Sequence, residues 1–162
     1  MNNKQTTIKD SVSLEGVGIH TGKDVKLTFY PAKENTGYVF KRVDLDDKPE
    51  IEALAKYVVN TQRGTTLEKN GVKLKTTEHV LAALVGLEID NIVIEINAEE
   101  PPIMDGSSKF FVDALEKAGI KELDSLRNEY IVKDIISFYD PESGSEITLI
   151  PSENYQITTM VD

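Results

Sequence analysis

Cysteine is absent from this chain of 162 residues, and histidine occurs only twice, at His20 and His79. Without cysteine the protein has no disulfide framework, no thiolate zinc cluster and no cysteine nucleophile. Any chemistry that depends on an imidazole is therefore limited to two positions.

Long apolar runs are missing as well. The longest, residues 80–87, is far shorter than the roughly 20 residues that a helix needs to cross a bilayer. Residues 1–6 lack the apolar region of a secretory signal peptide. The sequence therefore predicts a protein without a transmembrane segment that resides in the cytoplasm.

Basic residues are scarce, because 18 Lys and Arg stand against 28 Asp and Glu, which gives a formal charge of −10. A nucleic-acid-binding surface normally carries net positive charge or a basic stripe, so we expect no nucleic-acid partner. Residues 1–127 contain 17 basic and 21 acidic side chains, whereas residues 128–162 contain one and seven. This change in charge predicts a boundary between two domains, 1–127 and 128–162.

The first domain has several signals for strands. Residues 25–30 alternate between apolar and polar side chains, and residues 38–43 are rich in β-forming types. The dipeptide Asn70-Gly71 is a strong short-range signal for a hairpin. Residues 91–97 are apolar on both faces at their centre, which is typical of a central strand covered on at least one side.

Two helices are expected in the same domain. Thr76 or Thr77 can cap the first, which would end at Gly86, and Ser107 or Ser108 can cap the second. The apolar stripe of the second helix comprises Phe110, Phe111, Ala114, Leu115 and Ala118. Strands and helices together predict an α+β fold, a two-layer sandwich of a roughly five-stranded sheet with two helices.

The second domain reads as three strands, at residues 130–136, 146–150 and 155–161, with no helical period. A three-stranded meander with one apolar face is incomplete without a covering layer. We therefore expect it to pack on the first domain, to self-associate through its exposed strands, or to begin a domain that is larger than this segment.

Glu78 and His79 lie in the first turn of the first predicted helix. A base-rate interpretation makes His79 an ordinary solvent-facing residue. The partial positive charge of a helix N-terminus, however, favours an ionised Glu78 and a neutral His79, the forms that metal-assisted hydrolysis requires. Catalytic zinc takes three protein ligands. Since Ala83 occupies the position where a second helical ligand would lie, the other ligands must come from elsewhere.

Other polar segments have ordinary interpretations beside functional ones. The glycine-rich segment 16–22 around His20 indicates a tight turn, or else a loop that contacts substrate. Residues 60–66 form either a plain connector or a rim on which Arg63 faces an anion. The pair Glu99-Glu100 is expected on the solvated surface.

Taken together, five segments resemble the UDP-3-O-acyl-N-acetylglucosamine deacetylases, the zinc hydrolases of the committed step in lipid A synthesis. They follow one another in the family's order across residues 5–162, a stretch that corresponds to about half of a family member. The segments are residues 16–22, 35–37, 76–84, 86–95 and 102–107.

The resemblance implies two similar α/β domains around an active site, of which this chain supplies the first domain and the opening strands of the second. It assigns Glu78 as the general base and His79 as one zinc ligand. The remaining ligands would lie in a C-terminal half, so the chain alone is expected to be inactive. The implied substrate is an acylated UDP-sugar. Residues assigned to substrate binding are His20, Thr61, Arg63 and Gly64.

A different class of function stays open at this point. The same scaffold could serve as a non-catalytic α/β binding or assembly module, because a fold does not determine a function.

Overall fold

The structure is a computed structural model that describes residues 4–161. Its contacts divide the chain into two compact units, of which unit 1 ends at Arg127 and unit 2 begins at Asn128. Within the described residues, neither α-helix is long and apolar enough to cross a membrane.

Unit 1 holds two α-helices, one short 3-10 helix and ten strands within residues 4–127, about twice the number of strands expected from the sequence. The helices are α1 (Glu78–Gly86), α2 (Lys109–Ala118) and η1 (Ala55–Tyr57). The strands are β1 (Lys4–Ile8), β2 (Val12–Val17), β3 (Asp24–Pro31), β4 (Tyr38–Arg42), β5 (Glu50–Glu52), β6 (Val58–Asn60), β7 (Thr66–Lys69), β8 (Val72–Leu74), β9 (Ile92–Ile96) and β10 (Ile120–Leu126).

A five-stranded sheet in the order β2-β3-β9-β4-β5 forms the centre of unit 1. Strand β9 is its middle strand, as predicted for residues 91–97, and it pairs antiparallel with β3 and parallel with β4. Alternation places one set of β3 side chains on the buried face, namely Val25, Leu27 and Phe29. The opposite face carries polar residues such as Lys26 and Thr28.

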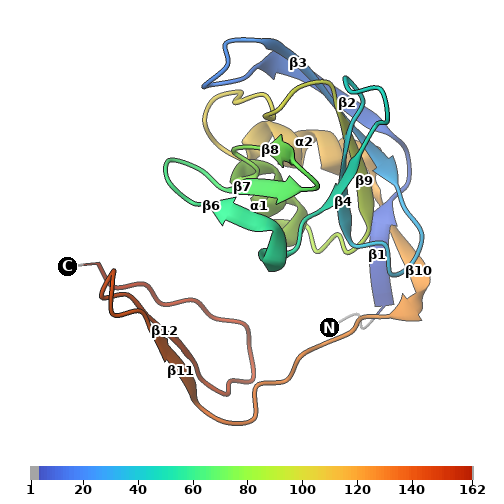
Figure 1. The fold of residues 1–162 in the computed structure, drawn as a ribbon. Helices are drawn as coiled ribbons and strands as arrows, with labels where there is room; N and C mark the ends of the chain where they lie inside the picture. The colour runs from blue at the N-terminus through green and yellow to red at the C-terminus, as the bar shows by residue number, and fades with distance from the viewer. Residues whose placement is uncertain (1–3, 162) are drawn as a thin grey trace. The chain divides into compact units, whose positions relative to one another are not determined.

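Figure 1 shows both helices on the same side of this sheet. Helix α1 buries Val80, Ala83 and Leu84, and α2 buries Phe111, Ala114, Leu115 and Ala118 against the same core. The predicted α+β fold is confirmed. The prediction is wrong for one residue of the apolar stripe, because Phe110 lies on the flank of α2 with 42% of its surface exposed.

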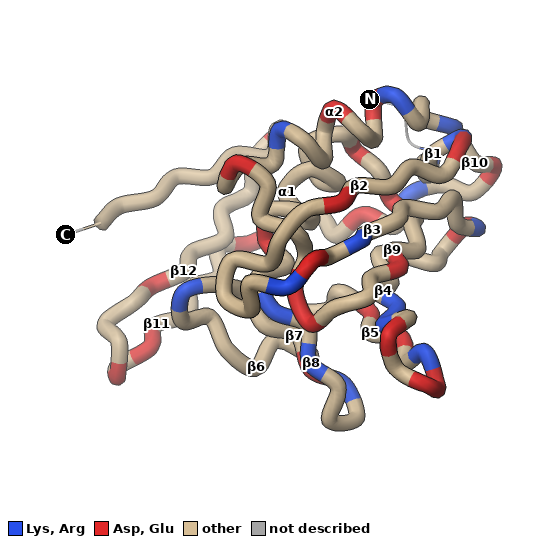
Figure 2. The backbone as a smooth tube through the Cα atoms, turned by 90° about the horizontal axis from the view of Figure 1, so that it is seen from above, with Lys and Arg blue, Asp and Glu red and all other residues tan. Residues whose placement is uncertain are grey.

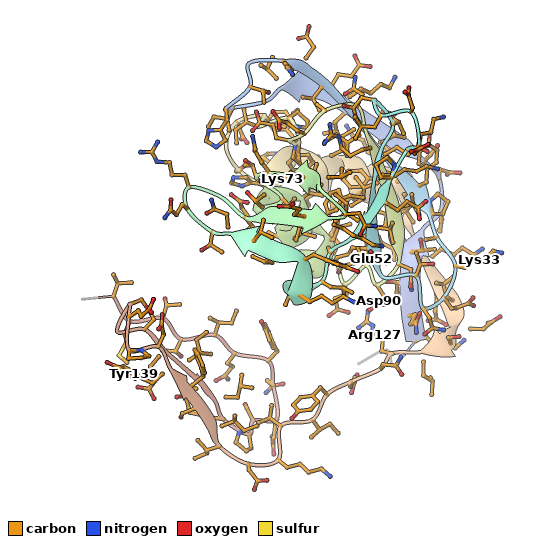
Figure 3. All side chains as sticks on the ribbon, in the orientation of Figure 1. Lys33, Glu52, Lys73, Asp90, Arg127 and Tyr139 are labelled. Carbon is orange, nitrogen blue, oxygen red and sulfur yellow. The ribbon has the colours of Figure 1, made fainter. Side chains whose placement is uncertain are left out.

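Strands β1 and β10, which the sequence did not reveal, pair antiparallel and join the two ends of unit 1. Arg127, the last residue of unit 1, lies beside Asp90, and its Nε is 2.9 Å from Asp90 Oδ2 (Figure 3). The same carboxylate oxygen accepts a 2.7 Å hydrogen bond from the backbone N–H of Thr6. One acid thus links β1 and the residue that follows β10 to the loop before β9.

A second, smaller sheet contains β6, β7 and β8. The turn between β7 and β8 is the predicted one, with φ of 52° at Asn70 and 80° at Gly71. Both values are typical of the two-residue turns that favour Asn-Gly. This hairpin is confirmed.

Unit 2 contains two described strands, β11 (Ile136–Tyr139) and β12 (Glu146–Leu149), which pair antiparallel. The three-stranded meander is therefore wrong. Residues 155–161 form no strand, since an extended segment needs a hydrogen-bonded neighbour to be stable. One face of the hairpin is apolar, and all four of its side chains are exposed: Ile136, Phe138, Ile147 and Leu149.

Candidate functional site

Glu78 and His79 begin helix α1, and both side chains are half-buried. Thr77 occupies the N-cap position and is fully buried, and its carbonyl accepts the N–H of Leu81 at 3.0 Å. The predicted capping by a hydroxyl is wrong, because the Thr77 hydroxyl donates instead to the carbonyl of Thr65 at 3.2 Å. The start of the helix is therefore tied to the loop that precedes β7.

This loop contacts the carboxylate of Glu78 directly. The backbone N–H of Thr65 donates to Glu78 Oε2 at 2.8 Å, and the N–H of Thr77 donates to the Thr65 carbonyl at 3.2 Å. Within the described residues, Glu78 Oε1 takes no hydrogen bond. One carboxylate oxygen is thus held in place, and the other is left as an acceptor.

Gly64 allows the loop to approach this closely. A Cβ atom at position 64 would lie 3.2 Å from Glu78 Oε1 and 3.5 Å from Thr76 Cα, and the φ angle is 150°, which side chains rarely adopt. Thr76 has a φ of 54°, an unusual value for a β-branched residue. Strained backbone of this kind often clusters at functional sites.

The structure brings some of the predicted site residues together and leaves others apart. Gly64 and Glu78 are neighbours, and His79 follows Glu78 in the helix. Thr61 and Arg63 belong to the same turn as Gly64 but are exposed. The contribution of Thr65 was missed, because a backbone N–H leaves no signal in the type of residue.

The described residues do not contain a complete zinc site. Nowhere in residues 4–161 do three or more His, Asp or Glu side chains gather so that they could hold a metal ion. His79 offers one imidazole, and a catalytic zinc ion takes three protein ligands.

His20 lies in an exposed turn that a buried acid supports. Glu100 is 0% exposed, so its expected place on the solvated surface is wrong. Its Oε1 accepts hydrogen bonds from the N–H of His20 at 2.9 Å and from the N–H and hydroxyl of Thr21, both at 2.8 Å. Burial by itself raises the pKa of Glu100, but these donors outweigh it and hold the pKa below its ordinary value.

Two hollows on unit 1 lie away from Glu78. One, of about 570 Å³, is lined by Lys41, Asp47, Lys48, Pro49, Glu50, Lys69 and Asn70. The other, of about 370 Å³, is mostly apolar and is lined by Glu15, Gly16, Val17, Ile103, Met104, Asp105 and Phe110. Basic and acidic positions are interspersed along unit 1 in Figure 2, and two lysines of the first hollow are paired with acids.

Comparison with known proteins gives these observations a context. The family model described as LpxC: UDP-3-O-acyl N-acetylglycosamine deacetylase matches residues 5–162. The bifunctional enzyme LpxC/FabZ of Chlorobaculum tepidum is 48% identical over 158 residues, which are 98% of this chain and 34% of the relative. The UDP-3-O-acyl-N-acetylglucosamine deacetylase of Hahella chejuensis is 43% identical over 159 residues, 98% of this chain and 52% of the relative.

The chain belongs to the UDP-3-O-acyl N-acetylglycosamine deacetylase family. It spans about one third of the length of the bifunctional relatives and about half of the length of the single-function ones. The resemblance found in the sequence is therefore confirmed.

Proposed function

We propose that the whole protein removes the N-acetyl group of an acylated UDP-N-acetylglucosamine in lipid A synthesis, and that this chain contributes the general base and one zinc ligand. The observation that supports this most strongly is the environment of Glu78 in a member of this family. One of its oxygens is held by Thr65, and the other faces Gly64 without a hydrogen bond from the described residues.

In this proposal, Glu78 Oε1 accepts the proton of the attacking water, and the Thr65 N–H keeps the carboxylate oriented while it does so. His79 would hold zinc through a ring nitrogen, and the other ligands would come from parts of the whole protein outside this chain. The chemistry that zinc supplies when bound is polarisation of the amide carbonyl and acidification of water. Unit 1 by itself is inactive, because the chain offers one imidazole at this site.

The substrate contacts are assigned to His20, Thr61, Arg63 and Gly64. Three of these belong to the turn that leads into Thr65, so a sugar held by this turn would lie beside the proposed base. Residues 1–127 are proposed as the first domain of the deacetylase and residues 128–162 as the first strands of its second domain. The cytoplasmic location expected from the sequence stays a prediction.

The test is acetate release from the acylated UDP-sugar by the whole enzyme. Glu78→Gln should lower kcat by roughly 100-fold or more, because it removes the proton acceptor and keeps the shape of the side chain. His79→Ala should lower both activity and bound zinc. Glu116→Gln, on the exposed face of α2, is the matched control and should leave both unchanged. Full turnover by Glu78→Gln would refute the assignment, and a non-catalytic module would release no acetate at all.

A further inference from the structure

Glu100 is unusual among the acids of unit 1 because it is fully buried and receives its hydrogen bonds from one short turn. All three donors to its Oε1 belong to His20 and Thr21, and Oε2 is buried without a partner in residues 4–161. Burial of a carboxylate is costly unless hydrogen bonds compensate for it. The turn and the acid therefore depend on each other.

Two glycines allow the turn to pack closely against the segment that contains this acid. A Cβ at Gly18 would lie 2.3 Å from Glu100 Oε1, and one at Gly16 would lie 2.9 Å from Pro102 Cβ. Neither glycine has a positive φ, so each is required by the close approach and not by its own conformation. Residues 16–21 thus lie directly against the segment that contains Glu100.

This arrangement fixes the backbone of His20 and leaves its side chain accessible. The His20 N–H is bonded to Glu100, while the residue as a whole is exposed. An accessible side chain on a rigid backbone is preorganised, because less conformational freedom is lost when it meets a ligand. A turn that served only to connect β2 and β3 would not need a buried charge beneath it.

We propose that Glu100 is a positioning residue that holds the His20 imidazole in place for contact with the substrate. It acts through the backbone N–H groups of His20 and Thr21 and does not touch the substrate. The inference rests on the proposed function, in which His20 is a substrate contact.

The test is a double-mutant cycle in the whole enzyme, with kcat/KM for acetate release as the measurement. Glu100→Ala should lower kcat/KM by roughly 10- to 100-fold, the range seen when a group that orients a functional side chain is lost. In a His20→Ala background, the same substitution should have little further effect, since there is no imidazole left to position. An equal loss with and without the imidazole would overturn the proposal, because it would show a general structural role.

Further variants keep the test informative if Glu100→Ala does not fold. Thr21→Val removes only one of the three donors, and Gly18→Ala places a Cβ between Glu100 Oε1 and the Thr21 hydroxyl. The effect of each on kcat/KM should likewise disappear in the His20→Ala background. Glu99→Ala is the matched control, because this neighbouring acid pairs with Lys75 at 3.2 Å. It should leave kcat/KM unchanged in both backgrounds.

The outcome separates this inference from the proposed function. Loss of turnover in Glu78→Gln together with full turnover in His20→Ala would overturn the positioning role and leave the deacetylase assignment in place. Retention of turnover in Glu78→Gln would overturn the assigned base, while the cycle between Glu100 and His20 could still be measured.

Discussion

Substitution of Gly64 by alanine tests the contact between the loop and Glu78. The added Cβ would lie 3.2 Å from Glu78 Oε1, so one of the two must shift by a few tenths of an ångström. The φ of 150° adds backbone strain, of order 1–3 kcal/mol for an unfavourable conformation. We expect the free energy of unfolding to fall by about this amount.

Activity should fall as well as stability in this variant. A misplacement of about 1 Å can cost about 100-fold in rate, so a shift of a few tenths of an ångström at the proposed base should cost roughly 3- to 10-fold in kcat. Urea denaturation of this chain gives the stability, and acetate release by the whole enzyme gives the rate.

Gly71→Ala is the matched control for this experiment. Gly71 also has a positive φ, of 80°, but a Cβ there would meet no atom within 4 Å. It therefore reports strain without a contact with Glu78 and should leave kcat unchanged. If the two alanine variants lost turnover to the same extent, the close approach of Gly64 to Glu78 would have no catalytic meaning.

Three further predictions concern stability and association. Burial, followed by the charge of Asp90, raises the pKa of Tyr38 to about 12. Below pH 10 this shift should contribute at most about 2–3 kcal/mol to the free energy of unfolding, and the contribution should be lost as the pH rises from 10 to about 12. Unfolding curves of Tyr38→Phe should lack this pH dependence. Arg127→Ala should lower the free energy of unfolding by about 1–3 kcal/mol in urea denaturation, because Asp90 loses a hydrogen-bonded partner; an unchanged midpoint would contradict this. Unit 2 should self-associate through its apolar hairpin face, so Phe138→Ser should lower the apparent mass in sedimentation, and an identical mass for both forms would argue against it.

Local patterns in the sequence were sufficient for part of the fold. The alternation in β3 and the Asn70-Gly71 turn involve residues that are close in the chain, so their signals could be read directly. Strand β1 was missed because its buried side chains include polar ones, Gln5 and Thr7. Their partners lie far away in the chain: the Thr7 hydroxyl, for example, donates to the carbonyl of Asn91 at 2.7 Å.

The candidate site, like the fold, could be predicted from the sequence only where the signal is local. Glu78 and His79 were recognisable because a helix start is a local feature. The buried state of Glu100 was not, since Glu99 and Glu100 are identical in type and adjacent, and only the distant turn at residues 18–21 distinguishes them. Gly18 in that turn and Gly16 in β2 were the available signal, but a glycine that provides space cannot be told by type from one that provides flexibility.

The parallel pairing of β4 with β9 has a consequence for how the site comes into being. Parallel neighbours require a crossover connection, and here residues 43–91 form it. This one excursion carries the small sheet, the turn with Gly64 and the helix that begins with Glu78. Closing such a long-range pair is slow relative to local structure formation, so the candidate site should form only when β4 and β9 pair in the central sheet.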